Sequence, residues 1–122
     1  MKLHLAHNAG LQLFSGYGAG YVAVNSVRYE KSVVVGPHAV IEWEVSGFEA
    51  LTAAHFGFIE ALKPEIMILG TGAAQRFPRP DLLRALAATG VSVEVMDSRA
   101  ACRTYNILAT EGRKVVAAIL TA

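Results

Sequence analysis

The chain has 122 residues and a mass of 13.0 kDa, of which 53% are hydrophobic, 17% charged and 8% aromatic. This composition excludes intrinsic disorder, collagen and coiled coils, and a lone cysteine excludes a disulfide scaffold. The longest uninterrupted apolar run, Val115 to Leu120, is far shorter than the roughly 20 residues that cross a bilayer. We therefore expect one soluble domain over residues 1–122 with no direct membrane insertion.

The net charge of +1 gives no general attraction to nucleic acid, and we expect no nucleic-acid partner. Residues 1–75 carry four basic residues against six glutamates, whereas residues 76–122 carry seven basic residues against four acids. Six of those seven are arginines. The positive charge is therefore local.

The first residues lack the apolar stretch of a secretory signal, so the cytoplasm is the expected compartment. His4 and His7 are the only closely spaced histidines, and without nearby cysteine or aspartate they make a poor metal site. We expect no metal and no cofactor.

The first half of the chain has the period-two pattern of strands. Ile41, Trp43 and Val45 alternate with glutamates, which predicts a strand with one buried face. Residues 21–24 and 27–35 flank Asn25-Ser26 and predict a hairpin. The glycine-rich segment 15–21 before it is typical of close backbone packing or a bulged hairpin.

Helical spacing begins near residue 51. Apolar residues over 51–62 predict one helix that ends at Lys63-Pro64, with Phe56 as a candidate exposed aromatic and His55 on the apolar face as a core histidine. Residues 66–69 are apolar on both faces, as in a central strand.

The second half alternates strands and helices. Pro80 and Gly90 delimit a helix, residues 91–96 form a strand, Ser98 caps a helix that runs to about Glu111, and residues 115–120 form a buried strand. This order implies at least one parallel strand pair. The predicted fold class is α/β, a three-layer domain with a mixed central β-sheet, helices packed on it and an additional antiparallel β-hairpin layer.

Parallel strands ending at Leu69 and Met96 would bring Gly70-Thr71-Gly72 and Asp97-Ser98 to one carboxyl edge, where open α/β sheets bind ligands. Free N–H groups at the start of the following helix would favour a small anionic ligand there. The alternative is a strand-to-loop turn that needs glycine for conformational reasons.

The third helix carries an ordered polar face. Arg99, Arg103, Asn106, Thr110 and Arg113 fall on one side of a helical wheel. This face is either simply solvated or a recognition surface for carboxylates, phosphates or an acidic partner.

Cys102 lies in the first turn of the same helix. Next to Arg103 it could be a nucleophile or redox sensor, but its place on the wheel favours a small buried hydrophobe. Thr104 and Asn106 are indifferent helix formers, which indicates that this stretch, with Tyr105, has specific bonds to make.

Several motifs together carry a resemblance to a known family. They are Gly16-Tyr17-Gly18 with Gly20-Tyr21, Val33-Val34-Val35 with Pro37 and Trp43, Leu69 to Gly72, and Met96-Asp97 through Ala101 to Asn106 and on to Arg113. The chain resembles the small α/β family that includes the mitochondrial respiratory complex I assembly factor 3 and related bacterial and archaeal proteins. The resemblance implies a three-layer mixed-sheet fold and a binding role, and it supplies no catalytic mechanism.

Two functions follow as expectations. The first is a non-catalytic protein-interaction or assembly-accessory factor, related to a respiratory complex, with an unidentified protein partner. The alternative is a small-molecule or anion-binding protein, either a simple binder or an enzyme, with its site at the edge formed by Gly70 to Gly72, Asp97 and Cys102. The candidate binding residues are Gly70, Thr71, Gly72, Asp97, Ser98, Arg99, Cys102, Arg103 and Asn106.

Overall fold

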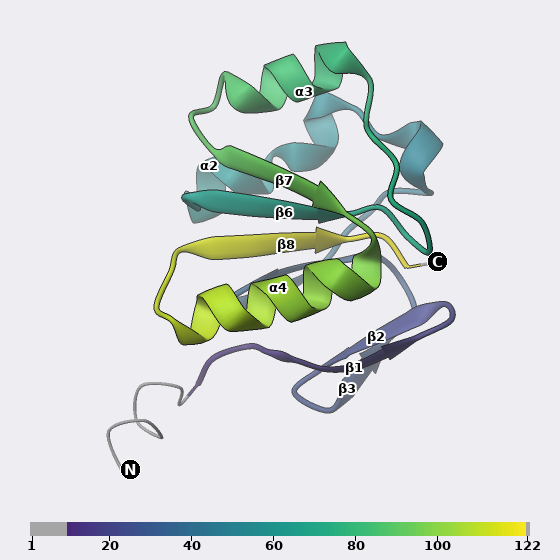
Figure 1. Ribbon diagram of the computed structural model, residues 1–122, viewed down its shortest axis with the longest axis vertical. Helices are drawn as coiled ribbons and strands as arrows, with labels where there is room; N and C mark the ends of the chain where they lie inside the picture. The colour runs from purple at the N-terminus through teal and green to yellow at the C-terminus, as the bar shows by residue number, and fades with distance from the viewer. Residues whose placement is uncertain (1–9, 122) are drawn as a thin grey trace.

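Three short strands near the start of the chain form a small antiparallel sheet in the computed structural model, which describes residues 10–121 (Figure 1). They are β1 (Phe14–Gly18), β2 (Tyr21–Val24) and β3 (Val27–Tyr29), paired in that order. Asn25 and Ser26 turn the chain with φ angles of 47° and 70°, the left-handed conformation of tight hairpin turns. The predicted hairpin is confirmed, but the expected strand over 27–35 is divided between two sheets.

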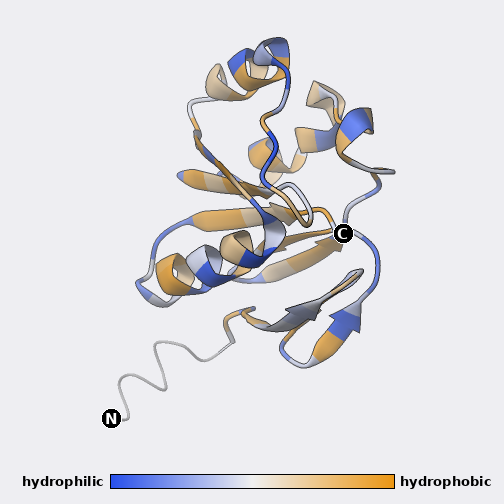
Figure 2. Cartoon of the chain, turned by 45° about the vertical axis from the view of Figure 1, so that its right-hand side comes forward, coloured by the Kyte–Doolittle hydropathy of each residue, from blue (hydrophilic) through white to orange (hydrophobic). Residues whose placement is uncertain are grey.

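Five further strands form the mixed sheet at the centre of the molecule. They are β4 (Val33–Gly36), β5 (Ala39–Glu42), β6 (Ile66–Gly70), β7 (Ser92–Met96) and β8 (Val115–Ile119), in the order β5-β4-β8-β6-β7. β6 is parallel to both of its neighbours, whereas β4 is antiparallel to both of its own. Figure 2 shows that β6 and β8 are apolar along their length. This agrees with the prediction that both strands are buried within the sheet.

Helices cover both faces of this sheet (Figure 1). One face carries the 3-10 helices η1 (Phe48–Ala50) and η2 (Ala53–Phe56) with α2 (Phe58–Leu62) and α3 (Pro80–Ala87). The other face carries α4 (Ser98–Thr110) and the small antiparallel sheet. The three-layer α/β fold predicted from the sequence is confirmed.

Alternation along the central strands divides the core in two. Met67 and Leu69 of β6 pack in the cluster under α3 and the short helices, whereas Ile68 packs in the cluster under α4 and the hairpin sheet. Each face of the sheet therefore buries a separate apolar layer, as expected for a strand covered on two sides.

The region 41–62 differs from its predicted structure. β5 ends at Glu42, so Ile41 is 42% exposed on an edge strand while Trp43 turns into the core. The indole N–H of Trp43 donates to the carbonyl of His55 at 2.8 Å, which removes that carbonyl from a continuous helical ladder. In place of the expected single helix are two short pieces, η2 and α2, which meet at Gly57, and the second ends at Lys63 as predicted.

Phe56 was expected to be exposed, and this prediction is wrong. Its side chain is only 4% exposed, and its ring packs against that of Trp43 with centroids 5.4 Å apart. His55 is satisfied locally, because its Nδ1 accepts a hydrogen bond from the Thr52 N–H at 3.0 Å.

Candidate functional site

The carboxyl ends of the parallel strands β6, β7 and β8 meet at one edge of the mixed sheet. Gly70, at the end of β6, is paired with Met96 of β7 and with Ile119 of β8. The segments that follow these strands therefore lie together, as predicted for the first two. This edge brings together Gly70, Thr71, Gly72, Asp97 and Ser98 among the candidate residues.

Ser98 joins all three segments through a buried hydroxyl. Its Oγ accepts a hydrogen bond from the Gly72 N–H at 2.8 Å and donates one to the Leu120 carbonyl at 2.7 Å. The Ser98 N–H in turn donates to the Gly72 carbonyl at 2.9 Å. The polar groups of Gly72 and Ser98 are thus occupied by the fold.

The cap of α4 is Asp97, so the prediction that Ser98 caps this helix is wrong. The Asp97 carboxylate accepts from the Ala100 N–H at 2.9 Å. Serine and aspartate both cap helices, but here the Ser98 hydroxyl donates to the carbonyl of Leu120, the residue that follows β8. The expectation of free N–H groups here is also wrong for Ser98 and Ala100, because both are bonded internally.

The two glycines have structural explanations. A Cβ on Gly70 would lie 2.9 Å from the Ile119 side chain, 2.9 Å from the Ser98 hydroxyl and 3.1 Å from the Ala101 methyl group. Gly72 has a φ of 99°, which L-residues with side chains rarely adopt. Close approach of α4 at the first position and a turn at the second account for this motif.

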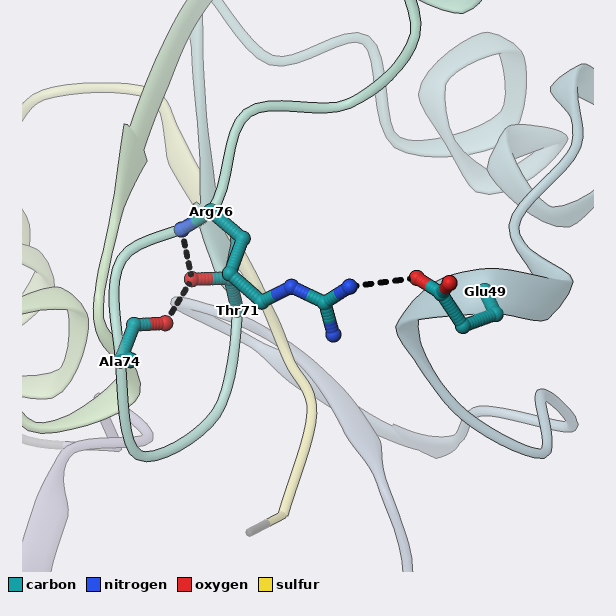
Figure 3. Close-up of polar contacts among 4 residues, drawn as sticks. All are labelled: Glu49, Thr71, Ala74 and Arg76. Carbon is teal, nitrogen blue, oxygen red and sulfur yellow. Dashed lines mark hydrogen bonds and ion pairs between the residues drawn. The ribbon is translucent and has the colours of Figure 1, made fainter.

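Thr71 closes the loop that follows β6 (Figure 3). Its hydroxyl donates to the Ala74 carbonyl at 2.7 Å and accepts from the Arg76 N–H at 3.1 Å. The Arg76 guanidinium pairs with the Glu49 carboxylate and lies 4.2 Å from the centroid of the Phe48 ring. The loop is therefore held against the segment around η1.

Two cavities open at this edge, one on each side of the strip formed by residues 72–73 and 120–121. The larger, about 720 Å³, lies between the loop after β6 and segment 42–48, with Lys31, Trp43 and Arg76 in its lining. The smaller, about 240 Å³, is lined by Ser98 and Arg99 of α4 and by Tyr17 and Tyr21 of the hairpin sheet. The edge offers space for a ligand on both sides.

The predicted arginine face is only partly assembled. Arg99 and Arg103 are exposed on α4, and the Arg103 guanidinium donates to the Tyr17 hydroxyl at 3.0 Å. Arg113 lies beyond the helix, which ends at Thr110, so the wheel that placed it beside the other two does not apply. It lines a different cavity at the opposite end of the strands.

Asn106 links α4 to the hairpin sheet. Its side-chain oxygen accepts from the Phe14 N–H at 2.9 Å, and its side-chain nitrogen donates to the Phe14 carbonyl at 2.8 Å. Tyr105 donates its hydroxyl to the Gln12 carbonyl at 2.8 Å. The specific bonds expected of this stretch are confirmed at both residues.

Cys102 is buried, with 1% of its surface exposed, and it lines neither cavity at the edge. Burial raises the pKa of its thiol to about 12, although Arg103 opposes the shift. The hydrophobic interpretation of this residue is confirmed, and a nucleophilic role at ordinary pH has no support from this environment.

Three aromatic residues at or near the edge were missed as candidates. Tyr17 and Tyr21 line the smaller cavity, and Phe77 is 71% exposed on the loop before α3. The glycine-rich segment was predicted to pack closely or to form a bulged hairpin, and β1 does have a register shift between Phe14 and Gly16. Its tyrosines contributed to the family resemblance but were not predicted as binding residues. Phe77 stands between Arg76 and Pro78, outside any periodic pattern, so nothing local predicted its exposure.

Over residues 10–121 the structure contains no group of three His, Cys, Asp or Glu side chains that could hold a metal ion. The predicted weak pair His4 and His7 lies outside the described residues. None of the described helices has the length and apolar character needed to cross a membrane.

The chain has clear relatives. Residues 14–120 match the family described as "Protein of unknown function (DUF498/DUF598)". The 13 kDa major membrane protein of Francisella tularensis subsp. holarctica (strain LVS) is 31% identical over 109 residues, covering 88% of this chain and 89% of that protein. NADH dehydrogenase (ubiquinone) 1 alpha subcomplex assembly factor 3 of Bos taurus is 34% identical over 106 residues, covering 85% of this chain and 58% of that protein.

Solved structures agree with the fold. The crystal structure of a Bordetella parapertussis protein is 40% identical with a TM-score of 0.84, covering 93% of this chain and 98% of that one. The NMR structure of a Xanthomonas campestris protein is 35% identical with a TM-score of 0.77, covering 88% of this chain and 84% of that one. The match over residues 14–120 and the relatives above 30% identity show that the chain belongs to the DUF498/DUF598 family, and they confirm its resemblance to complex I assembly factor 3.

Proposed function

We propose that this protein is a non-catalytic protein-interaction or assembly-accessory factor. Its similarity to relatives named as assembly factors supports the class of function. The observation that carries the proposal is Phe77, a large apolar side chain that is 71% exposed on a loop held in place at both ends. Exposed aromatic side chains on fixed backbone are the usual anchors of protein interfaces.

The loop is held by contacts on both sides of Phe77. Before it, Arg76 pairs with Glu49. After it, the Arg79 guanidinium donates to the Leu51 carbonyl at 3.1 Å and lies 3.4 Å from the Asp81 carboxylate. A loop already ordered by these contacts loses little conformational entropy when a partner covers its aromatic side chain.

A second contact surface is proposed on α4. Arg99, Arg103 and Ile107 lie at successive four-residue intervals, and Ile107 is 58% exposed. Two guanidinium groups beside an apolar side chain suit an acidic partner surface with an apolar centre. We therefore expect the partner to contact this helix, the Phe77 loop or both.

The test is quantitative affinity capture from native lysate with the full chain. Phe77→Ala should weaken binding of a defined partner about thirtyfold, since anchor residues contribute on the order of 2 kcal/mol. Val27→Ala is the matched control, because Val27 is 54% exposed on the separate hairpin sheet. Equal recovery by wild type and Phe77→Ala removes the loop from the proposal.

The α4 surface has its own variant pair. Arg103→Glu should weaken capture of the same partner, whereas Tyr17→Phe should leave it unchanged, because it removes only the hydrogen bond to Arg103 and keeps the charge. If charge reversal leaves every specific partner in place, this helix face is only a solvated surface.

The second candidate function is binding of a small anion in the smaller cavity at the carboxyl edge. The observation that favours it is the convergence of Arg99 with the Tyr17 and Tyr21 side chains around about 240 Å³. Of the predicted candidates, Arg99 would supply the charge, with Arg103 holding Tyr17. An NMR titration with inorganic phosphate should shift resonances around this cavity, and Arg99→Gln should abolish those shifts.

A cytoplasmic location is proposed from the sequence alone. Subcellular fractionation of the native cells should recover the chain with the soluble proteins. Recovery with the membranes, in line with the name of the Francisella relative, would contradict it.

A further inference from the structure

A separate cavity lies at the amino end of the parallel strands, opposite the edge described above. It has a volume of about 530 Å³, within the range of about 300–1,000 Å³ typical of small-molecule sites. It lies where the turn between β4 and β5, the end of α2 and the connection from α4 to β8 come together. Its apolar lining includes Ala39, Leu62, Pro64, Ala109 and Val116.

The polar part of the lining has one sign of charge. Arg113 and Lys114 line the cavity with His38, and no carboxylate belongs to its lining. Among the described residues, neither Arg113 nor Lys114 has a carboxylate within ion-pair distance. Glu111 is the nearest acid along the chain, and Glu65 lies near in space, where its carboxylate accepts the Lys114 backbone N–H at 3.4 Å.

We propose that this cavity binds an aliphatic monocarboxylate, with the carbon chain against the apolar lining and the carboxylate at Arg113 and Lys114. Burial of methylene groups favours the chain of such a ligand. The planar guanidinium of Arg113 can donate two parallel hydrogen bonds to a carboxylate, and Lys114 adds a second positive charge. A cation or a neutral alcohol of the same length can contact the apolar lining but cannot form an ion pair with Arg113 and Lys114.

A purely structural role for the two cations makes a different prediction. Arg113 and Lys114 follow the end of α4, where positive side chains offset the partial negative charge of the helix terminus. That role requires no ligand. It therefore predicts that an added compound does not bind more tightly when it has both an aliphatic tail and a negative charge.

The experiment is an amide-resolved NMR titration of the full chain with octanoate, 1-octanol, octylammonium and acetate. Octanoate should give saturable shifts confined to the cavity, at Ala39, Leu62 and Ala109 among others. 1-Octanol and octylammonium should bind at least about tenfold more weakly, because they lack the negative charge, and acetate should bind more weakly still, because it lacks the tail. Octylammonium binding as tightly as octanoate would overturn the proposal, and so would shifts that do not saturate or that lie elsewhere.

Variants separate the two halves of the site. The double variant Arg113→Gln with Lys114→Gln should weaken octanoate about tenfold and leave 1-octanol unchanged, whereas the control Arg84→Gln on α3 should change neither. Ala39→Leu, at a half-buried position of the lining, should fill the cavity and weaken both compounds. Equal losses in the double variant and the control would contradict the role of these cations.

The choice of a small molecule over a peptide is tested in the same titration. Acetyl-Ala-Ala-Leu with a free carboxylate presents an aliphatic side chain and a carboxylate at a peptide end. It should bind more weakly than octanoate, because its peptide groups would be buried without partners. Tighter binding of this peptide would overturn the assignment to an aliphatic monocarboxylate.

Discussion

Asn106→Ala should loosen the attachment of the hairpin sheet to α4 without unfolding the central sheet. Asn106 helps to fix β1 to the helix, because its side chain makes both an accepting bond at 2.9 Å and a donating bond at 2.8 Å to the backbone of Phe14. The truncated side chain can make neither. The Phe14 N–H and carbonyl would then remain partly buried without these partners.

The magnitude follows from these contacts. Two hydrogen bonds contribute about 1 kcal/mol each, and the stranded backbone groups of Phe14 add about 1 kcal/mol. Alanine is the better helix former by about 0.5 kcal/mol, which offsets part of the loss. The free energy of unfolding should fall by about 2.5 kcal/mol, and the melting temperature by about 10 °C for a domain of this size.

Urea denaturation and native-state hydrogen exchange together test this reasoning. Amides of β1 and β2 should exchange faster in Asn106→Ala, whereas amides of β6 and β8 should lose protection only as far as global stability falls. Ile107→Ala is the control, since Ile107 is the adjacent exposed residue of the same helix and should change stability by less than about 0.5 kcal/mol. An Asn106→Ala protein as stable as this control would refute the assigned role.

Three further outcomes are expected. Gly70→Ala should lower stability in urea by about 2 kcal/mol, because the added Cβ overlaps packed atoms, whereas Gly16→Ala, whose Cβ would lie 4.0 Å from its nearest neighbour, should be close to neutral. Ser98→Ala removes a buried hydroxyl that bridges Gly72 and the end of β8. The free energy of unfolding should fall by about 2 kcal/mol, and thermal denaturation should show a correspondingly lower melting temperature. Cys102 should resist iodoacetamide at pH 8 until the chain unfolds. Because burial raises its pKa from 9.0 to about 12, its contribution to stability is complete below pH 9 and falls as pH rises toward 12. Alkylation at the rate of a free thiol in the folded protein would contradict this.

Sequence patterns that span only a few residues predicted much of the fold. The doubly apolar run at Ile66 to Leu69 reports burial on both faces, and Lys63-Pro64 marks the end of the preceding helix. The parallel pair of β6 and β7 followed from the order of elements. These features depend on local conformation and periodicity, which can be predicted from neighbouring residues alone.

The errors occurred where a distant residue decides the local outcome. Ser98 has the right chemistry for a cap, but the carbonyl of Leu120 takes its hydroxyl, and Asp97 caps the helix instead. Residues 51–62 have helical spacing, but the indole of Trp43 takes the His55 carbonyl. Neither partner could be known before the tertiary fold was known.

The same competition explains why the candidate site changed character. Gly72, Ser98 and Asn106 were predicted as binding residues because ligand binding can explain polar or flexible residues within apolar elements. In the structure each of them is hydrogen-bonded to another segment of the fold, so their polar groups hold these segments together. The side chains that remain accessible to a partner or ligand lie at the surface. They are Arg99 beside a cavity and Phe77 on a fixed loop. That distribution favours recognition of a partner or ligand over catalysis within a buried centre, and it is the reason the proposed tests change surface residues.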